Sequence, residues 1–447
     1  MAENKLGVMP VSKLIWNMSL PIIASMLVQA LYNIVDSVFV SWVSEASLTA
    51  VSLAFPAQNL MISLAAGTAV GVNALLGRAL GAGERQRADR VAVNGLFLAF
   101  VGFAVSCVLG LTCAGAFLRS QTQVEEIIVM GEQYLHIVMG CSFALFGQIM
   151  LERLLQGTGR SLLSMYTQGL GAIVNIILDP VFIFVFDMGV AGAAIATVIG
   201  QICGMLLAAY FNVKKNTDIT LRVKGFRPDW RLIGSIYAIG LPSVIMMAIG
   251  SVMTFLMNKI LITYHSAHET AATAFGIYFK LNSFIFMPVF GLNNGTVPIV
   301  AYNFGARKGD RMKKTIQYAI CAAVGIMIVG MLLFQSIPDR LLRLFDASDE
   351  MLRIGVPALR IISLAFPLAG FGIGASSVFQ ALGYSVYSMI VSLIRQLVVL
   401  IPCAYVIGRV TGDVTGVWWA FFIAELVSLM VSALYLRRVN RNVIRTI

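Results

Sequence analysis

Long runs of apolar residues, separated by short polar segments, recur along the whole chain. A helix needs about 20 predominantly apolar residues to cross the hydrocarbon core of a bilayer, and the runs are long enough for that. None of them alternates with the period of two that marks a membrane β-barrel. The pattern predicts twelve transmembrane helices, at residues 12–42, 47–78, 88–118, 126–155, 160–186, 190–213, 232–264, 269–302, 312–336, 352–381, 385–408 and 414–436.

The composition agrees with a membrane protein and excludes a soluble core. Hydrophobic residues make up 59% of the chain and charged residues 12%, whereas soluble domains average about 25% charged residues. The first apolar run is too long for a removable signal peptide and lacks its small-residue cleavage site. We therefore interpret that run as the first transmembrane helix.

Basic residues divide the predicted loops into two classes. Successive loops between the predicted helices lie on opposite sides of the membrane. The loops of one side hold 23 of the 32 lysines and arginines, those of the other side hold five, and the remaining four lie within helices. Basic residues concentrate in the cytoplasmic loops of membrane proteins. The distribution predicts a multi-pass protein of the cytoplasmic (inner) membrane with both termini in the cytoplasm. It also explains the net charge of +11 without a nucleic-acid partner.

The two halves of the chain repeat each other. Residues 71–82 align with 295–306, and residues 156–159 align with 380–383, in both cases 224 positions apart. Six helices per repeat is an even number, so the halves have the same orientation and are related by an axis along the membrane normal.

The predicted fold is therefore an all-α membrane protein of two six-helix lobes related by a parallel internal repeat. The first lobe covers residues 1–213 and the second covers 232–447. A basic cytoplasmic loop at 214–231 joins them. This organisation is typical of secondary transporters.

A carboxylate in the first predicted helix is the most informative polar residue. Gln29, Asn33 and Asp36 follow at i, i+4 and i+7, so they form one polar stripe on a helix. A charged group in hydrocarbon is costly and must face the interior of the helix bundle or a water-filled cavity. We interpret Asp36 as a group that handles protons or ions.

A second carboxylate is predicted at the same depth. Asn175 and Asp179 lie at i and i+4 in the fifth helix, and Pro180 frees a backbone carbonyl one turn back. Like Asp36, Asp179 lies about two turns from the outer end of its helix. Two carboxylates in one dry pocket cannot both stay ionised at little cost, so the pair can take up a proton or Na⁺. The alternative is a hydrogen bond that only fastens helices together.

The second half carries different charges. Glu425 lies in the last predicted helix, and Arg395 of the neighbouring helix could pair with it. A static buried ion pair and a role in transport are both compatible with this sequence. Lys280, followed by Asn282, lies deep enough in its helix to line a central cavity.

No catalytic constellation accompanies these residues. The sequence shows no nucleophile–base pair, no cluster of metal ligands and no nucleotide motif. The glycine-rich turns at 81–83 and 305–307 lack the preceding strand and the Gly-Lys-Ser/Thr sequence of a phosphate loop. We therefore predict a protein that is not an enzyme, needs no cofactor and is driven by an ion gradient.

Taken together, these segments resemble the multidrug and toxic compound extrusion (MATE) family, in particular its bacterial multidrug exporters and damage-inducible-type members. The resemblance covers nearly the whole chain, and the order of its motifs on a six-plus-six repeat makes it specific. The motifs are Leu-Tyr-Asn-Ile-Val-Asp at 31–36, Gly-Ala-Gly at 81–83, Gln-Gly-Thr-Gly at 156–159, Asn-Ile-Ile-Leu-Asp-Pro at 175–180, Gly-Val-Ala-Gly-Ala-Ala-Ile-Ala-Thr at 189–197 and Pro-Ile-Val-Ala-Tyr-Asn-Phe-Gly at 298–305.

The resemblance implies two lobes in a V shape around a central cavity. It implies export of cationic amphipathic drugs in exchange for H⁺ or Na⁺, and both ions fit the sequence. The cation site would consist of Asp36, Asn175, Asp179 and Thr197, which would also hold Na⁺ if that is the ion. The resemblance places Tyr134 beside this site.

Some Na⁺-driven relatives carry a glutamate shortly after the Leu-Pro of the seventh helix, where this chain has Gly250. This departure points to the first lobe for coupling. The expected partners are membrane lipid and small organic cations, and the protein is expected to act as a monomer. The candidates for the substrate cavity are Gln29, Asn33, Lys280, Asn282, Arg395 and Glu425.

Three other functions compete with drug export. A flippase of lipid-linked sugars would need cations to hold a pyrophosphate, and Lys280, Arg360 and Arg395 could serve, but the deep charges of the first lobe are acidic. A channel is disfavoured because no ring of filter residues accompanies the repeat. A membrane-embedded enzyme is disfavoured by the missing catalytic groups.

Overall fold

The computed structural model describes residues 4–222, 224–264, 268–345 and 348–444, and all regular structure in these ranges is helical. The first half contains α1 (Lys5–Val8), α2 (Val11–Val43), α3 (Glu45–Gly81), α4 (Arg85–Arg119), α5 (Glu125–Gly140), α6 (Phe143–Gly157), α7 (Ser161–Pro180), η1 (Val181–Val185) and α8 (Gly189–Lys214). The second half contains α9 (Trp230–Tyr264), α10 (His268–Gly305), α11 (Gly309–Ser336), α12 (Pro338–Arg343), α13 (Asp349–Ser363), α14 (Phe366–Ala381), α15 (Ser385–Leu393), η2 (Ile394–Leu400), α16 (Ile401–Thr411) and α17 (Val414–Asn442).

Ten of the described helices, with α7–η1 and α15–η2–α16 each taken as one, are long and apolar enough to cross a membrane. Two further spans are broken: α5 and α6 meet at 45°, and α13 and α14 meet at 50°. With each broken pair taken as one span the total is twelve, as the sequence predicts. The breaks also repeat, because α6 begins at Phe143 and α14 begins at Phe366, 223 positions later.

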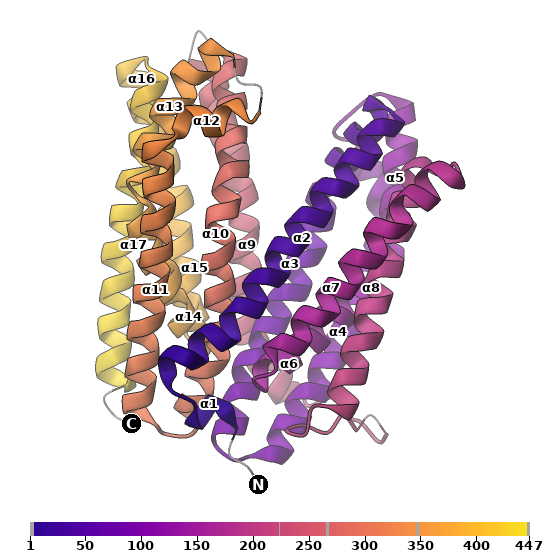
Figure 1. Ribbon diagram of the computed structural model, residues 1–447, viewed down its shortest axis with the longest axis vertical. Helices are drawn as coiled ribbons and strands as arrows, with labels where there is room; N and C mark the ends of the chain where they lie inside the picture. The colour runs from indigo at the N-terminus through magenta and orange to yellow at the C-terminus, as the bar shows by residue number, and fades with distance from the viewer. Residues whose placement is uncertain (1–3, 223, 265–267, 346–347, 445–447) are drawn as a thin grey trace. The chain divides into compact units, whose positions relative to one another are not determined.

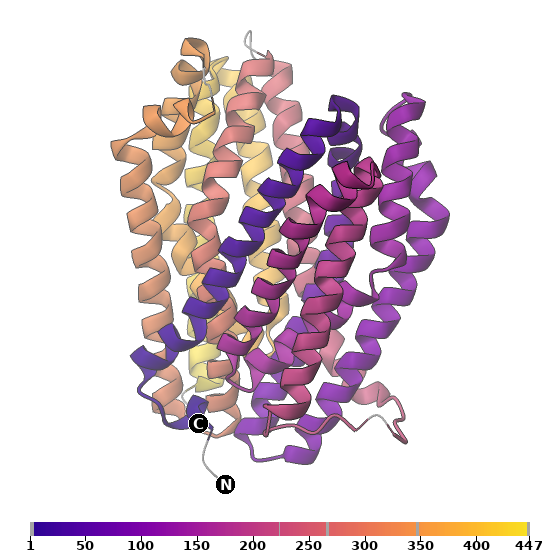
Figure 2. The same ribbon diagram turned by 45° about the vertical axis from the view of Figure 1, so that its right-hand side comes forward.

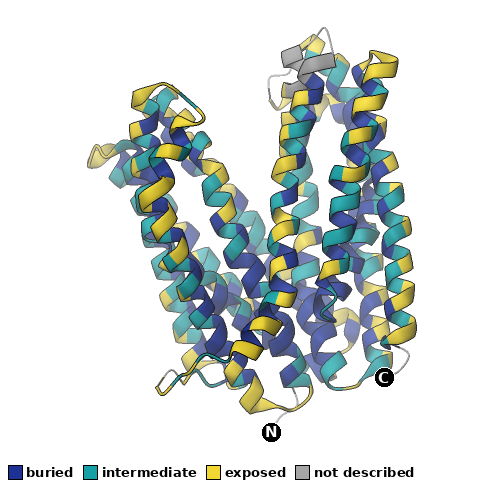
Figure 3. Ribbon diagram, turned by 180° about the vertical axis from the view of Figure 1, so that it is seen from behind, coloured by how far each residue is buried: buried dark blue, intermediate teal, exposed yellow. Residues whose placement is uncertain are grey.

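Many large apolar side chains point outward from the helices. Val185 is 75% exposed, Phe255 69%, Phe100 63% and Leu206 60%. Figure 3 shows exposed and buried positions side by side along most helices. Apolar exposure on this scale is unfavourable in water but favourable against lipid tails. The chain is therefore a multi-pass membrane protein.

The chain forms two compact units. The first unit holds Met1–Val8 and Leu20–Val244, and the second unit holds Met9–Ser19 and Ile245–Ile447. Helices α2 and α9 therefore each contribute to both units. Both helices contain a proline close to the changeover, Pro21 in α2 and Pro242 in α9. A proline inside a helix removes one backbone hydrogen bond and bends the helix.

The first part of α9 packs on α3 within the first unit at two glycines. A Cβ atom on Gly67 would lie 2.3 Å from Val244 Cγ2, and one on Gly71 would lie 2.2 Å from the carbonyl oxygen of Ile236. Any side chain there would force the helices apart. Gly295, which the repeat aligns with Gly71, makes the corresponding close contact with α2 in the second unit.

The segment between α8 and α9 is held to the first unit by hydrogen bonds. Arg160 donates to the carbonyl oxygen of Lys215 at 3.1 Å and to Asn216 Oδ1 at 3.1 Å, and it forms an ion pair with Asp218. The backbone nitrogen of Thr220 donates to a carboxylate of α4 at 2.6 Å. Burial beside Arg160 lowers the pKa of Lys5 at this end of the unit, with desolvation as the larger cause.

Helices α7 and α8 lie side by side in the first unit, as Figure 1 and Figure 2 show from two directions. The α7 helix ends at Pro180, and the chain continues as the π-helix η1 because the proline nitrogen cannot donate to the preceding turn. A second π-helix, η2, interrupts the corresponding span of the second unit and carries Arg395. Wide turns of this kind occur often at functional sites.

Candidate functional site

Three helices of the first unit bring the predicted cation-site residues together. Asp36 lies in α2, Asn175 and Asp179 lie one turn apart in α7, and Thr197 lies in α8. The Asn175 amide nitrogen donates to Asp179 Oδ1 at 3.1 Å and to Thr197 Oγ1 at 3.3 Å. The charge of Asp36 acts on Asp179. We call these two carboxylates the acid pair.

Helix α7 has a polar face that is buried and an apolar face that is exposed, the reverse of a surface helix in a soluble protein. Its buried face carries Thr167, Asn175 and Asp179, spaced so that they lie on one side of the helix. On the other side, Ile173 is 57% exposed and Ile177 is 60% exposed. In a bilayer the apolar side faces lipid, so the polar side must face protein.

Three oxygen atoms of the site are buried and receive no hydrogen bond. Asp179 is 0% exposed, Asn175 2% and Asp36 9%. Within the part of the chain that the structure describes, Asp36 Oδ1, Asp179 Oδ2 and Asn175 Oδ1 have no donor. A buried acceptor without a donor is unfavourable by about 1–3 kcal/mol. A bound proton or a small cation would satisfy such a cluster.

The donor set suits a hard cation better than a transition metal. Carboxylate, amide and hydroxyl oxygens are the ligands that hard cations prefer. The described residues contain no group of three or more His, Cys, Asp or Glu side chains that could hold a metal ion. A Na⁺ ion at the acid pair would therefore need Asn175 and Thr197 in addition to the two carboxylates.

Tyr134 borders the acid pair without a hydrogen bond to it. This α5 residue is 2% exposed, and its hydroxyl donates to Gln58 Oε1 of α3 at 3.5 Å. It lies within reach of the charge of Asp36. The hydroxyl is thus held by a residue of a neighbouring helix rather than by the acid pair.

The polar stripe predicted on α2 is not uniformly buried. Gln29 is half-buried and Asn33 is exposed, whereas Asp36 is buried. The backbone carbonyl of Asn33 accepts a hydrogen bond from Ser37 at 2.8 Å. Of the three residues of this stripe, Asp36 alone is buried and belongs to the acid pair.

A glycine contact closes the site on the side away from η1. A Cβ atom on Gly200 of α8 would lie 2.6 Å from the carbonyl oxygen of Gly171 and 3.2 Å from Asn175 Cβ. The two helix backbones therefore touch one turn below Asn175. This contact fixes the distance between α7 and α8, and with it the hydrogen bond between Asn175 and Thr197.

Two of the charged residues predicted in the second unit form an ion pair. Arg395 donates to Glu425 Oε1 at 3.0 Å, and Glu425 Oε2 is buried without a partner among the described residues. Lys280 is exposed, with Nζ 6.0 Å from the ring centre of Phe345. Asn282 has a buried Oδ1 that receives no hydrogen bond from any described residue.

One buried carboxylate of the first unit is absent from the sequence-based candidates. Glu152 of α6 is 4% exposed and accepts hydrogen bonds from Gln148 and Thr167. Its position near the end of the fourth predicted span, followed by Arg153, is typical of a residue at the membrane surface. The spacing of Gln148 and Glu152 at i and i+4 is the sequence signal that indicates a buried polar face.

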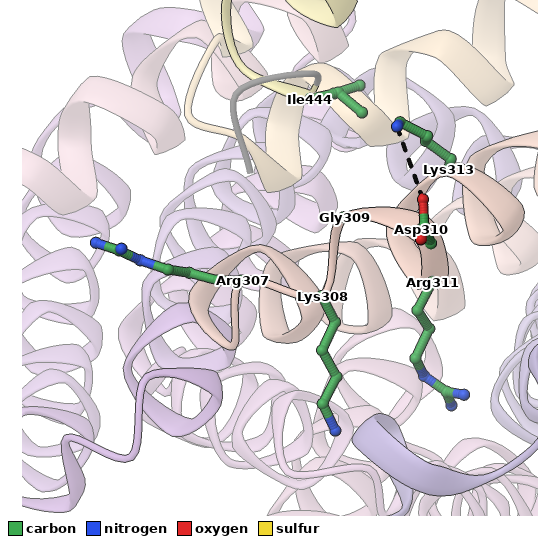
Figure 4. Close-up of a pocket in the computed structure, with 7 residues that line it drawn as sticks. All are labelled: Arg307, Lys308, Gly309, Asp310, Arg311, Lys313 and Ile444. Carbon is green, nitrogen blue, oxygen red and sulfur yellow. Dashed lines mark ion pairs between the residues drawn. The ribbon is translucent and has the colours of Figure 1, made fainter.

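A cavity of about 380 Å³ lies elsewhere, in the second unit between the start of α11 and the end of α17. Its lining residues are Arg307, Lys308, Gly309, Asp310, Arg311, Lys313 and Ile444. Figure 4 shows that the cations do not converge: Lys313 points to Asp310 at 3.8 Å, and Arg307 and Lys308 point in other directions. The cavity is therefore separate from the acid pair and is not built around one anion.

Comparison with known proteins identifies relatives over most of the chain. The family model described as MatE matches residues 21–181 and 242–406. The multidrug export protein MepA of Staphylococcus aureus (strain MSSA476) is 27% identical over 424 residues, which cover 93% of this chain and 91% of MepA. MepA of Staphylococcus haemolyticus (strain JCSC1435) is 28% identical with the same coverage.

Solved structures agree with this assignment. A MATE structure in the bent conformation aligns with a TM-score of 0.94 and 27% identity, covering 100% of this chain and 99% of its own. An outward-facing multidrug resistance MATE family transporter of the MOP superfamily aligns with a TM-score of 0.92 and 28% identity, with 98% of each chain covered.

Proposed function

We propose that this chain, which belongs to the MatE family of multidrug efflux transporters, exports cationic amphipathic compounds in exchange for H⁺ or Na⁺. The observation that carries the proposal is the acid pair. Asp36 and Asp179 lie in the first unit with three buried oxygens that lack a donor among the described residues. A group of this kind binds a cation in one conformation and releases it in another.

The coupling follows from the energy of a buried charge. Two carboxylates in a medium of low dielectric constant repel each other, and a bound proton or Na⁺ relieves the repulsion. The ion favours whichever conformation binds it more tightly, and it changes the equilibrium only by that difference in affinity. We propose that ion binding from outside favours the conformation with low affinity for the exported compound.

The arrangement in the membrane follows from the distribution of charge. The last turns of α3 and α8 carry the basic residues Arg78 and Lys214. We assign this side, and both termini with it, to the cytoplasm, and we propose that the membrane is the cytoplasmic membrane. We propose that one chain suffices for transport, since the acid pair is built from α2, α7 and α8 of a single unit.

The test is efflux of a fluorescent cationic dye from proteoliposomes under a Na⁺ gradient and a pH gradient imposed separately. Asp36→Asn and Asp179→Asn keep the shape of each side chain and remove its charge. Asp187→Asn is the matched control, because Asp187 is exposed and lies eight residues after Asp179. We expect efflux driven by one gradient, lost in both site variants and retained in the control. Dye movement indifferent to both gradients, or retained in the site variants, contradicts the proposal.

Export of lipid-linked sugars remains the second candidate, and the cations of the second unit bear on it. Arg395 is engaged by Glu425, Lys280 is exposed beside Phe345, and Arg360 is exposed. The charge of Arg395 is thus compensated by a carboxylate, which leaves it less available to hold a pyrophosphate. We therefore favour the drug antiporter.

A further inference from the structure

Glu152 is a carboxylate of the first unit that the coupling scheme above does not use. We propose that Glu152 is a second proton-exchange site, at which the coupling proton leaves the first unit toward the end where α6 and α8 terminate. The inference rests on the proposed function, because it assigns the inner end of the same ion pathway and commits to H⁺ as the ion.

Glu152 is buried and accepts its hydrogen bonds from uncharged groups. Its side chain is 4% exposed, and the hydrogen bonds to Oε1 come from Gln148 Nε2 at 3.0 Å and Thr167 Oγ1 at 2.8 Å. No ion pair to Glu152 occurs within the described ranges. The adjacent Arg153 donates to Gln156 Oε1 at 3.1 Å instead. A buried carboxylate in such surroundings is stabilised when it takes up a proton.

The groups around Glu152 are otherwise neutral. Arg153, on the same helix, is the charged residue whose field reaches it. Its two hydrogen-bond donors, Gln148 of α6 and Thr167 of α7, are uncharged, and so is Gly204 of α8, which packs on Gln148. The protonation of Glu152 is therefore set by burial, by its two hydrogen bonds and by Arg153.

A row of polar groups lies between Glu152 and the acid pair. Asp179 is bonded to Asn175, whose Cβ lies 3.2 Å from the Cβ position of Gly200. The Cβ position of Gly171 lies 3.8 Å from Gln148 Nε2, the atom that donates to Glu152. From Asp179 to Thr167 the buried face of α7 spans about 18 Å at 1.5 Å per residue. The row runs through the α7–α8 contact.

The glycine contact interrupts this row in the present conformation. The backbones of α7 and α8 touch at Gly171 and Gly200, so these two positions contribute no polar side chain to the row. We infer that the acid pair exchanges protons with one side of the membrane and Glu152 with the other, and that movement at this contact connects them. In each cycle a proton released from the acid pair forms a carboxyl O–H at Glu152; this O–H then breaks, the proton passes to water, and a carboxylate is left next to Arg153 on the same helix.

The second half of the chain builds the corresponding junction without a carboxylate. At an offset of 224, Ser376 stands in place of Glu152, Val391 in place of Thr167 and Gly372 in place of Gln148. The hydrogen bonds are arranged differently as well: Gln156 donates to Ser164 at 2.9 Å in the first unit, whereas in the second unit Ser376, which stands in place of Glu152, donates to Ser388 at 2.9 Å. The fold therefore does not require an acid at this position, which favours a functional reason for Glu152.

The test compares net and exchange transport in proteoliposomes. Glu152→Gln keeps an oxygen that accepts from Gln148 and Thr167 but cannot release a proton. We expect efflux driven by a pH gradient to fall about tenfold or more. Dye–dye exchange without a gradient needs no net proton movement and should stay within about twofold of wild type. An equal loss of both activities indicates a structural role and overturns the proposal, as does full retention of both.

Two further variants use the second half as a template. Glu152→Ser copies Ser376 and should behave as Glu152→Gln does. Thr167→Val copies Val391 and keeps the acid but removes one donor, so it should shift the pH dependence of efflux without abolishing efflux. Glu152→Asp retains a proton-exchanging group and should rescue part of the gradient-driven activity. Failure of the aspartate variant to exceed the serine variant contradicts a proton-exchange role.

A spectroscopic readout separates this proposal from the transport proposal. The infrared C=O band of protonated carboxyl groups can be followed against pH in the purified protein without any dye. We expect one pH-dependent component to vanish in Glu152→Gln and to persist in Asp36→Asn. Identical bands in wild type and Glu152→Gln overturn the inference whether or not wild type transports the dye. Loss of transport by wild type with this component present would overturn drug antiport alone.

Discussion

The two halves of the chain place different chemistry on the same scaffold. In the first unit, α7 and α8 touch through Gly171 and Gly200, and the acid pair lies one to two turns away. At an offset of 224, Arg395 stands in place of Gly171, and its partner Glu425 aligns with Gln201, next to Gly200. The second unit thus joins its helices by an ion pair of 3.0 Å where the first unit joins them by backbone contact.

The packing around this contact is also exchanged between the halves. In the first unit the Gln148 side chain fills the space above Gly204, where a Cβ would lie 2.6 Å from Gln148 Nε2. In the second unit the aligned residues are Gly372 and Ser428, and a Cβ on Gly372 would lie 3.7 Å from Ser428 Oγ. The larger side chain of the two thus comes from α6 in the first unit, as Gln148, and from α17 in the second unit, as Ser428. A repeat can therefore conserve helix spacing while it changes which residues are polar.

The largest expected difference between the halves concerns ion coupling. The residue that aligns with Asp179 is Cys403, and the one that aligns with Asn175 is Val399, so the second half has no counterpart of the acid pair. We expect Asp179→Asn to lower ion-driven efflux about a hundredfold, as removal of a proton-transfer group typically does. Cys403→Ala should leave efflux within about twofold. Equal effects of the two changes in the proteoliposome assay would show that the halves share the coupling.

Part of the fold and part of the candidate site can be predicted from the sequence alone. The spans, the repeat and the Asp36–Asn175–Asp179 set follow from periodicity and from the cost of charge in hydrocarbon, and both signals lie within single helices. Glu152 was missed because its burial depends on Thr167, fifteen residues away on the next helix. Likewise, the close approach of α7 and α8 depends on two glycines from different helices, a relation that no local pattern contains.

The second prediction concerns the stability of the ion pair. The side chains of Arg395 and Glu425 are 26% and 15% exposed. Removal of one member of a buried pair leaves the other charge without compensation and costs about 3–5 kcal/mol. We expect Arg395→Gln to lower the thermal unfolding temperature strongly, and Arg395→Gln combined with Glu425→Gln to restore most of it. A double variant as unstable as the single one would show that the pair is not a stabilising substitute for the glycine contact.

The third prediction concerns the glycine contact itself. Ala424 aligns with Gly200 and is accommodated in the second unit at 1% exposure. In the first unit, Gly200→Ala would place Cβ 2.6 Å from the carbonyl oxygen of Gly171, so α7 and α8 must separate. We expect a destabilisation of about 1–3 kcal/mol, typical of overpacking. Ala424→Gly, the matched change in the second unit, opens no such clash and should cost about 1 kcal/mol through helix propensity.

Unfolding of the purified variants followed by tryptophan fluorescence measures both changes, and efflux assays add a functional readout for Gly200→Ala. Asn175 lies beside Gly200, so a separation of the helices also lengthens the hydrogen bond from Asn175 to Thr197. Reduced coupling is therefore expected together with reduced stability. A Gly200→Ala variant with unchanged stability and unchanged coupling would contradict a contact that is specific to the first unit.

The smallest effect is expected at Lys280, a charge of the second half that lacks the burial of the first-half acids. Its Nζ lies 6.0 Å from the ring centre of Phe345, and the residue is exposed. A cation–π contact at an exposed position contributes about 0.5–1 kcal/mol. We expect Lys280→Gln to change stability by no more than this and to leave cationic dye efflux within about twofold. A Lys280→Gln variant with much faster or slower efflux would place this charge in the substrate path, and the second half would then carry part of the recognition that the acid pair is proposed to control.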